Sequence, residues 1–162
     1  MAPADHASDA GIKIVGTNRK AFHNYHVLER IEAGLELRGA EVKSLRAGHF
    51  SIAESYARVR NGEVRLHDFH IQPYAHARVE EHDPVRPKRL LLTRREIDRL
   101  FGKASLRGHA LIPLRLYFKH GLAKVEIGLC RGKQAEDKRE TMRRRTAERE
   151  AERAIAARTR RK

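Results

Sequence analysis

The sequence lacks tryptophan, has a single cysteine among its 162 residues, and has no long uninterrupted apolar stretch. Because Cys130 has no second cysteine to pair with, an internal disulfide and a zinc site built from several cysteines are both excluded. No apolar run approaches the roughly 20 residues that a membrane-spanning helix needs. The first residues, "MAPADHASDAG", have neither the basic start nor the apolar segment of a signal peptide. We therefore expect a cytoplasmic protein without a membrane partner.

Acidic residues are scarce relative to basic ones, with 21 Asp and Glu against 35 Lys and Arg and a net charge of +14. Residues 131–162 hold 13 of the basic and 6 of the acidic residues, so this segment carries +7 and the rest of the chain the other +7. Basic charge on both parts favours a polyanion that is contacted over an extended surface. RNA or DNA fits better than an anionic membrane, which the charge leaves open as an alternative.

Motifs for catalysis and metal binding are also missing. There is no carboxylate cluster for magnesium, no G-x-S-x-G elbow and no G-x-x-x-x-G-K-[ST] phosphate loop. Among ten histidines, His23 and His26, and likewise His67 and His70, lie three apart in strand-like segments and should point to opposite faces. We therefore expect no catalytic residue, no metal site and no cofactor. The enzymatic alternative is a metal-independent RNase using His23, His26 or His120 as acid and base.

What the sequence does contain is a series of strand patterns joined by short turns. Order is expected to begin near Ile12, and the segment 25–37 predicts a strand with one solvated face. The clearest hairpin is "YARVRNGEVRLHDFHI", in which Asn61-Gly62 supplies a type I′ turn. Its expected inward pairs are Ala57 and Val59 with Val64 and Leu66. After Leu66 the apolar residues fall on odd positions and no longer on even ones, which predicts a bulge near His67 and Asp68.

A capped helix and a second hairpin follow. Thr93 is the expected N-cap of the helix and Glu96 its reciprocal partner. The predicted buried stripe of this helix is Ile97, Leu100, Phe101 and Ala104. In the second hairpin, the residues expected to alternate inward are Ala110, Ile112, Leu114, Leu116 and Phe118, then Ala123, Val125, Ile127 and Leu129 after a turn at His120-Gly121.

These patterns predict a mainly β fold, because strands joined by short turns with helices inserted between hairpins favour an antiparallel barrel. We expect three segments: a disordered lead-in over residues 1–11, a barrel domain over 12–131, and a basic C-terminal tail over 132–162. Between the first strands lies "GAEVKSLRAG", which predicts a short amphipathic helix. In this helix Glu41, Lys43 and Arg46 should face away from the core while Val42 and Leu45 pack beneath.

Five segments, in order and spacing, resemble the SsrA-binding proteins, also called small protein B. They are "TNRKAFHNY", "EAGLELRGAEVKSLRAG", "DPVRPKRLLLTRREI", "LYFKHGLAKVEIGL" and "GKQAEDKRE", and the resemblance covers nearly all of residues 12–155. It implies an oligonucleotide-binding barrel that binds the tRNA-like domain of transfer-messenger RNA and delivers this RNA to bacterial ribosomes stalled on messages without a stop codon.

The resemblance also implies which residues contact RNA. They are Asn18, Lys20, His23, Glu32, Lys43, Arg46, Leu91, Lys119, Lys124, Arg131 and Lys133. Lys and Arg neutralise phosphates, Asn and Glu hydrogen-bond base edges or ribose hydroxyls, and an exposed leucine packs against an unstacked base. Two alternatives stay open. Leu91 within "LLL" could belong to the core, and Glu32 could serve merely as the counter-charge of a neighbouring arginine.

The tail has helical pairing but almost nothing to bury. Asp137 can cap a helix, with Glu140 at the reciprocal position and oppositely charged residues four apart beyond it. Alone in water the tail should be disordered or a frayed helix. The resemblance implies that it becomes helical in the message channel of the ribosome and acts at the decoding centre. The residues expected to contact the ribosome are Asp137, Lys138, Arg139, Arg143, Arg144, Arg145 and Ile155. Glu136 stands where the family commonly has an aromatic or imidazole side chain that could stack on a base.

The resulting hypothesis is a non-enzymatic RNA-binding adaptor, monomeric when free. Its partners are the tRNA-like domain of transfer-messenger RNA and the ribosome. Besides the RNase, the other alternative is a structural ribosomal protein with a basic tail.

Overall fold

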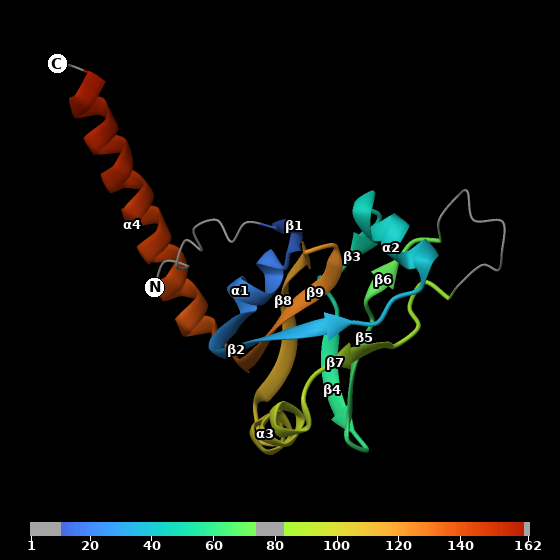
Figure 1. The fold of residues 1–162 in the computed structure, drawn as a ribbon. Coiled ribbons are helices and arrows are strands. Elements are labelled where there is room, and N and C mark those ends of the chain that lie inside the picture. Colours follow the sequence, from blue (N-terminus) through green and yellow to red (C-terminus); the bar gives the residue numbers. More distant parts are fainter. Residues whose placement is uncertain (1–10, 74–82, 161–162) are drawn as a thin grey trace.

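The computed structural model describes residues 11–73 and 83–160 and has a strongly curved antiparallel sheet at its centre (Figure 1). The strands are β1 (Ile12–Thr17), β2 (Tyr25–Leu35), β3 (Phe50–Ser51), β4 (Tyr56–Arg60), β5 (Glu63–His67), β6 (His70–Ile71), β7 (Lys88–Leu91), β8 (His109–Lys119) and β9 (Leu122–Gly132). The helices are α1 (Arg19–Asn24), α2 (Gly39–Arg46), α3 (Arg94–Ala104) and α4 (Ala135–Arg160).

The strands close into a ring, as the sequence predicted. The sheet has the order β1-β8-β4-β5-β7-β2-β9, and β9 also pairs with β8, so that six strands form a barrel with antiparallel neighbours. On one side of β8 lies β9, and the other side is shared between β4 and β1. The short strands β3 and β6 form a separate pair. The prediction of an antiparallel barrel is therefore confirmed.

The first hairpin has the predicted turn and register. Asn61 and Gly62 have φ angles of 52° and 72°, the positive values that a type I′ turn requires. Ala57 pairs with Leu66 and Val59 with Val64, as expected. The alternation of apolar residues also changes after Leu66, as predicted, but the cause is the end of strand β5 and not a bulge. Asp68 has a φ of 55°, and the chain then continues as β6, which pairs with β3.

The simple alternation predicted for the second hairpin is wrong in β8. The turn is as expected, with φ angles of 49° at His120 and 80° at Gly121. A register shift between Pro113 and Arg115, however, changes which face the side chains occupy. Leu111, Leu116 and Phe118 join the main core, whereas Ile112 and Leu114 join a second core with Ala21 and Cys130. One strand therefore contributes to two cores, and β9 follows the predicted pattern.

Helix α3 begins as predicted but buries less than predicted. The Glu96 backbone N–H donates to Thr93 Oγ1 at 3.3 Å, and the Thr93 N–H donates to Glu96 Oε2 at 2.8 Å, which completes the capping box. Leu100 is buried against the barrel, but Phe101 is 57% exposed. Because one residue turns a helix by about 100°, Phe101 lies at the edge of the surface that Leu100 covers. Its assignment to the buried stripe was wrong.

Helix α1 was not predicted, because its six residues carry no clear helical periodicity. Asn18 caps it, with its Oδ1 accepting a hydrogen bond from the Ala21 N–H at 3.1 Å. His23 therefore lies on a helix and His26 on the following strand, so the expectation that both lie in one strand-like segment was wrong.

Helix α2 buries a carboxylate that was expected to face away from the core. Leu45 packs inward as predicted, but Glu41 is also completely buried. Arg86 binds this carboxylate, with its Nε donating to Glu41 Oε2 at 3.1 Å, and the Arg38 N–H donates to Oε1 at 2.8 Å. Burial raises the pKa of Glu41, but the hydrogen bonds from Arg86 and Arg38 outweigh it and the net pKa is lowered. The periodicity of one helix could not reveal a partner 45 residues away.

A second buried charge lies beside this pair. Lys88 is fully buried on β7, and its Nζ donates to the carbonyl oxygens of Phe69 at 2.5 Å and Pro84 at 3.1 Å. Burial lowers the pKa of Lys88 to about 8. The lysine therefore ties β7 to the segment that follows β5.

The tail forms one long helix that points away from the barrel (Figure 1). The expected lead-in lies outside the described residues except for Gly11, as does the side chain of Glu136. Throughout the part of the chain that the structure describes, no helix has the length and apolar character needed to cross a membrane.

Candidate nucleic-acid interface

A row of side chains crosses five strands on the outer face of the barrel. Leu91 of β7 pairs with Gly34 of β2, Gly34 with Lys124 of β9, Lys124 with Tyr117 of β8, and Tyr117 with Ile14 of β1. Directly paired residues in antiparallel strands point to the same face. Two of the predicted RNA contacts, Leu91 and Lys124, are therefore brought into one row although they are 33 residues apart in the sequence.

A second predicted pair is held beside this row by Tyr117. The Tyr117 hydroxyl donates a hydrogen bond to Glu32 Oε2, and Lys119 Nζ lies 3.7 Å from the same oxygen. Burial, followed by the hydrogen bond and the negative charge of Glu32, raises the pKa of Tyr117 above its ordinary value. The phenol therefore stays protonated and keeps donating. We call Glu32, Leu91, Tyr117, Lys119 and Lys124 the outer-face cluster.

The alternative reading of Leu91 as core is wrong, because its side chain is 51% exposed. It lies over Gly34, where an added Cβ would be 3.1 Å from Leu91 Cβ. That distance is tighter than normal carbon contacts, so a glycine at position 34 allows the leucine to lie flat on the sheet. An exposed leucine at the end of a row that also holds a lysine is a surface on which an unstacked base can rest.

Sequence reasoning missed three members of this surface. Tyr117 joins two of the strands, and Ile14 and Leu122 are large apolar side chains that are more than half exposed. Leu122 pairs with Lys119, which in turn pairs with Ile12, so the apolar side chains flank the lysine across the sheet. The signal was present for Tyr117, since it alternates with the inward-facing Leu116 and Phe118 and must face outward.

A second set of predicted contacts surrounds α1. This helix packs on the outer face through Ala21, and it carries Lys20 and His23. Lys20 forms an exposed ion pair with Glu54. At the end of β9, Lys133 donates to the Phe22 carbonyl oxygen at 3.4 Å and to Thr141 Oγ1 at 3.3 Å.

The basic residues near the start of the tail raise the local positive potential. Arg131 is exposed and pairs with His26 across the β2–β9 ladder. Burial, with the nearby Arg145 and Arg144, lowers the pKa of Lys133. Repulsion of this kind is relieved when a phosphate approaches.

Asn18 does not lie where a base contact needs it. It is 2% exposed, and its Nδ2 donates to the carbonyl oxygens of Ile52 at 3.2 Å and Pro113 at 3.0 Å while Oδ1 caps α1. Its amide is therefore fully used in joining α1 to the barrel. The prediction of a direct RNA contact is corrected to a structural role.

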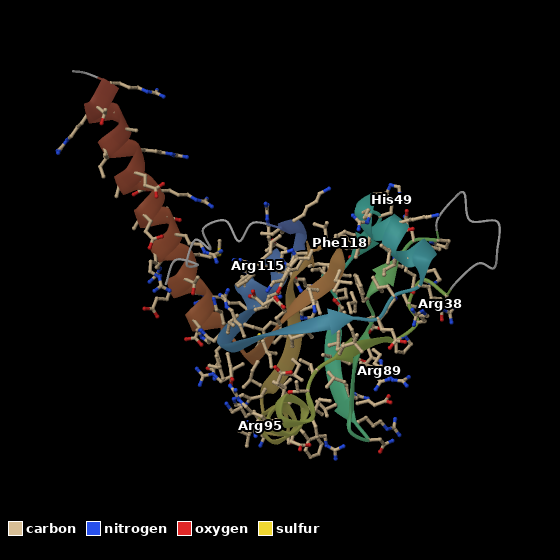
Figure 2. All side chains as sticks on the ribbon, in the orientation of Figure 1. Arg38, His49, Arg89, Arg95, Arg115 and Phe118 are labelled. Atoms are coloured by element: carbon tan, nitrogen blue, oxygen red, sulfur yellow. The ribbon has the colours of Figure 1, made fainter. Side chains whose placement is uncertain are left out.

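The two basic residues predicted on α2 lie apart from the row across the sheet. Lys43 and Arg46 are both exposed, and the Arg46 guanidinium stacks over the Phe118 ring with 4.3 Å between the guanidinium carbon and the ring centroid. Because Phe118 adjoins Lys119 on β8, this contact fixes Arg46 near the turn end of the hairpin. Figure 2 shows nitrogen-bearing side chains around the barrel and along the whole of α4.

Among residues 11–73 and 83–160, the hydrogen bonds that tie the tail to the barrel lie near the start of the tail. Asp137 Oδ2 lies 3.3 Å from His26 Nε2 and accepts a hydrogen bond from the Gln134 N–H at 3.3 Å. The bond to His26, then that from Gln134, lowers the pKa of Asp137. Farther along, the other predicted tail contacts are exposed except for the half-buried Lys138; they are Arg139, Arg143, Arg144, Arg145 and Ile155. The arginines are thus exposed on the helix surface.

Two of the candidate catalytic histidines, His26 and His120, lie too far apart to act as an acid–base pair. His26 begins β2 beside the end of β9, whereas His120 lies in the turn before β9. The strand between them has 11 residues, which places the two groups about 30 Å apart. Among residues 11–73 and 83–160 there is also no group of three metal-binding side chains.

Comparisons with known proteins find similarity along nearly the whole chain. The family model described as "SmpB protein" matches residues 15–157. The SsrA-binding protein of Carboxydothermus hydrogenoformans is 51% identical over 146 residues, 90% of this chain and 98% of that protein. The SsrA-binding protein of Geobacter sulfurreducens is 50% identical over 145 residues, 90% of this chain and 95% of that protein. A similar solved structure, described as "tmRNA-SmpB: a journey to the center of the bacterial ribosome", has a TM-score of 0.65 and 45% identity, covering 83% of this chain and 96% of that one.

Proposed function

The chain belongs to the SmpB protein family, and from that membership we propose that it binds the tRNA-like domain of transfer-messenger RNA and delivers this RNA to stalled bacterial ribosomes. The observation that carries the proposal is the match over residues 15–157, which takes in both the barrel and most of α4. The basic charge of the whole chain supports an RNA partner.

The two parts of the chain have separate tasks in this proposal. The barrel, residues 12–131, holds the tRNA-like RNA through the outer-face cluster, with Lys20, His23 and Arg131 as further phosphate or base contacts. Lys133, just after the barrel, adds another. Lys43 and Arg46 extend the basic surface at α2. The tail, residues 132–162, enters the message channel and reaches the decoding centre, where RNA phosphates screen its arginines. The separation of His26 from His120 supports a binding protein over an RNase.

The protein works as a monomeric adaptor in the cytoplasm and needs no cofactor. The test of RNA binding is a gel-shift titration with labelled transfer-messenger RNA at several salt concentrations. Lys124→Gln removes one phosphate contact and should lower the salt slope by about one unit. Leu91→Ala removes an uncharged contact and should weaken binding about tenfold with the slope unchanged. Arg95→Gln, an exposed basic residue on α3, is the matched control.

Equal losses from Lys124→Gln and Arg95→Gln would contradict a defined RNA-binding face, because any positive charge would then serve. Cleavage of the RNA by protein free of contaminating nuclease would favour the enzyme. Presence on every ribosome, stalled or not, would favour a structural ribosomal protein.

Truncation after Gln134 tests the division of labour. The shortened chain keeps the outer-face cluster, so its affinity for transfer-messenger RNA should change less than tenfold. Rescue of ribosomes on a message without a stop codon, measured by tagging of the nascent chain, should be abolished. Retained tagging would contradict a ribosomal role of the tail, and a larger loss of affinity would make the tail part of the RNA-binding surface.

A further inference from the structure

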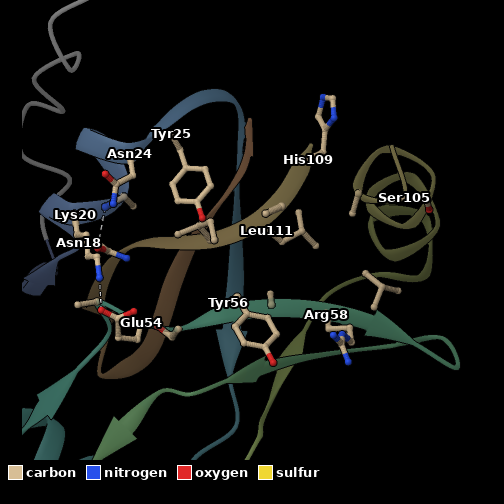
Figure 3. A pocket seen from close by; sticks show the side chains of 18 of the residues that line it. Asn18, Lys20, Asn24, Tyr25, Glu54, Tyr56, Arg58, Ser105, His109 and Leu111 are labelled. Carbon is tan, nitrogen blue, oxygen red and sulfur yellow. Dashed lines mark hydrogen bonds and ion pairs between the residues drawn. The ribbon is translucent and has the colours of Figure 1, made fainter. Parts of the chain in front are cut away.

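The barrel has an open seam between β4 and β8. β4 pairs with β5 along its full length, but its only cross-strand partner on β8 within the described chain is the Ala57–Leu111 pair. On either side of that pair the strands separate, and the space holds a pocket of about 590 Å³ between α1 and α3 (Figure 3). A volume of this size lies within the range of small-molecule binding sites.

Aromatic side chains line this pocket, which we call the seam pocket. Tyr25, Tyr56 and Phe101 line it and come from β2, β4 and α3. Figure 3 shows Tyr25 with its hydroxyl directed into the space above Leu111. Tyr56 is held by stacking on His67, with 5.3 Å between ring centroids and 15° between ring planes. The 57% exposed Phe101 also lines the pocket, from α3.

The polar side chains of the pocket favour an anion. Arg58 lies with its guanidinium carbon 5.9 Å from the Tyr56 ring centroid, which places a cation beside the aromatic wall. Lys20 lies at the rim near α1 and is paired with Glu54. These residues give two positive charges against one negative charge, and only one of the cations has a carboxylate partner. A phosphate can therefore bind at Arg58 while an aromatic base lies on the tyrosine and phenylalanine rings.

We propose that the seam pocket binds a single unstacked nucleotide of an RNA, its base against Tyr25 and Phe101 and its phosphate at Arg58. The inference rests on the proposed function in that its ligand is RNA, but it assigns a second site. Along β8 the pocket takes residues 109–112, whereas the outer-face cluster takes Tyr117 and Lys119. Leu111 and Tyr117 are six residues apart, or about 20 Å along a strand. One molecule can therefore hold two separate segments of RNA.

The test uses the full-length chain labelled with 15N and titrated with the oligonucleotides hexa-adenylate and hexa-uridylate. Amide chemical shifts should change at residues 57–59, 101–105 and 109–112. Phe101→Ala should weaken hexa-adenylate binding about tenfold, because stacking on an aromatic ring contributes on the order of 1–3 kcal/mol per base. Leu106→Ala is the matched control, since this side chain is equally exposed just after α3 but does not line the pocket.

Arg58→Gln gives a second, independent measurement and should lower the salt slope of hexa-adenylate binding by about one unit. Shift changes confined to the outer-face cluster, or equal affinities of the Phe101→Ala and Leu106→Ala variants, would overturn the proposal. Failure here is distinguishable from failure of the proposed function. The proposed function is tested by the gel shift of Lys124→Gln with transfer-messenger RNA, whereas the seam pocket is tested by the amide shifts of residues 57–59, 101–105 and 109–112 and by the Phe101→Ala and Leu106→Ala comparison.

Discussion

The hydroxyl of Tyr117 donates a hydrogen bond to the carboxylate of Glu32, and this contact spans strand β9, which lies between their two strands. Glu32 is thereby fixed although it faces solvent. Its ion-pair partner is Lys119 rather than an arginine, so the simple interpretation of Glu32 as a counter-charge to arginine is wrong. A carboxylate held in this way presents its remaining lone pairs to a ligand in one orientation.

Tyr117→Phe tests this arrangement. The variant removes only the hydroxyl, so the barrel should lose about 1 kcal/mol of unfolding free energy. Glu32 then becomes mobile, and affinity for transfer-messenger RNA should fall several-fold with no change of salt slope, as measured by gel shift. Unchanged affinity would show that the orientation of Glu32 does not matter for binding.

Asn18→Ala should act on stability. It removes the cap of α1 and the Nδ2 hydrogen bonds to the carbonyl oxygens of Ile52 and Pro113, at a cost of about 2–3 kcal/mol. Thermal unfolding of this variant should be compared with Lys20→Ala, an exposed change on the same helix. An Asn18→Ala variant with unchanged stability and reduced RNA affinity would restore the direct contact.

Arg86→Met should be among the most destabilising single changes in the barrel. It leaves the buried Glu41 charge without its partner, which typically costs about 3–5 kcal/mol. Arg65→Met breaks the exposed pair with Glu63 and should cost less than about 1 kcal/mol. Chemical denaturation of both variants measures the contrast, and the double change Glu41→Gln with Arg86→Met should recover part of the loss.

Lys88 should make stability depend on pH. Its pKa is about 8 in the folded chain and near the ordinary lysine value of 10.5 in the unfolded chain, so the unfolded state binds the proton more tightly. The free energy of unfolding should therefore rise with pH from about 8 toward 10.5. Between pH 8 and 9 the rise should be about 1 kcal/mol relative to Lys88→Met, as measured by urea denaturation. Identical slopes for both proteins would contradict the lowered pKa.

The free tail should open easily beyond its first turns. Within the part of the chain that the structure describes, the contacts with the barrel lie near its start and the later side chains are exposed. Backbone amides of residues 146–160 should exchange hydrogen within seconds in the free protein and more slowly on the ribosome. Hydrogen exchange followed by mass spectrometry measures both. Strong protection in the free protein would mean that the helix needs no partner.

Local patterns predicted much of the fold. Asn61-Gly62, His120-Gly121 and the Thr93–Glu96 capping box depend on residues close in sequence, and all three are present. The errors came from distant partners. Arg86 makes burial of Glu41 possible, and the shift near Pro113 divides β8 between two cores.

The candidate site could likewise be predicted only in part, because its arrangement depends on residues distant in the sequence. The resemblance named Leu91 and Lys124, but only the register of β7, β2 and β9 places them in one row. Asn18 was misassigned because an asparagine suits a base edge and a helix cap equally well. The seam pocket had no sequence signal, since it arises from strands that stop pairing.

The length of α4 makes it a spacer of defined reach. Its 26 residues extend about 39 Å from the barrel at 1.5 Å per residue. Adding one residue near its start would advance every later arginine by about 1.5 Å and swing it by about 100° around the axis. Adding seven would advance the same arginines by about 10 Å while nearly restoring their direction. The number of residues in α4 therefore sets the distance between an RNA on the barrel and a surface at the far end of the helix. The same number sets the direction in which the arginines point, and that direction nearly repeats every seven residues.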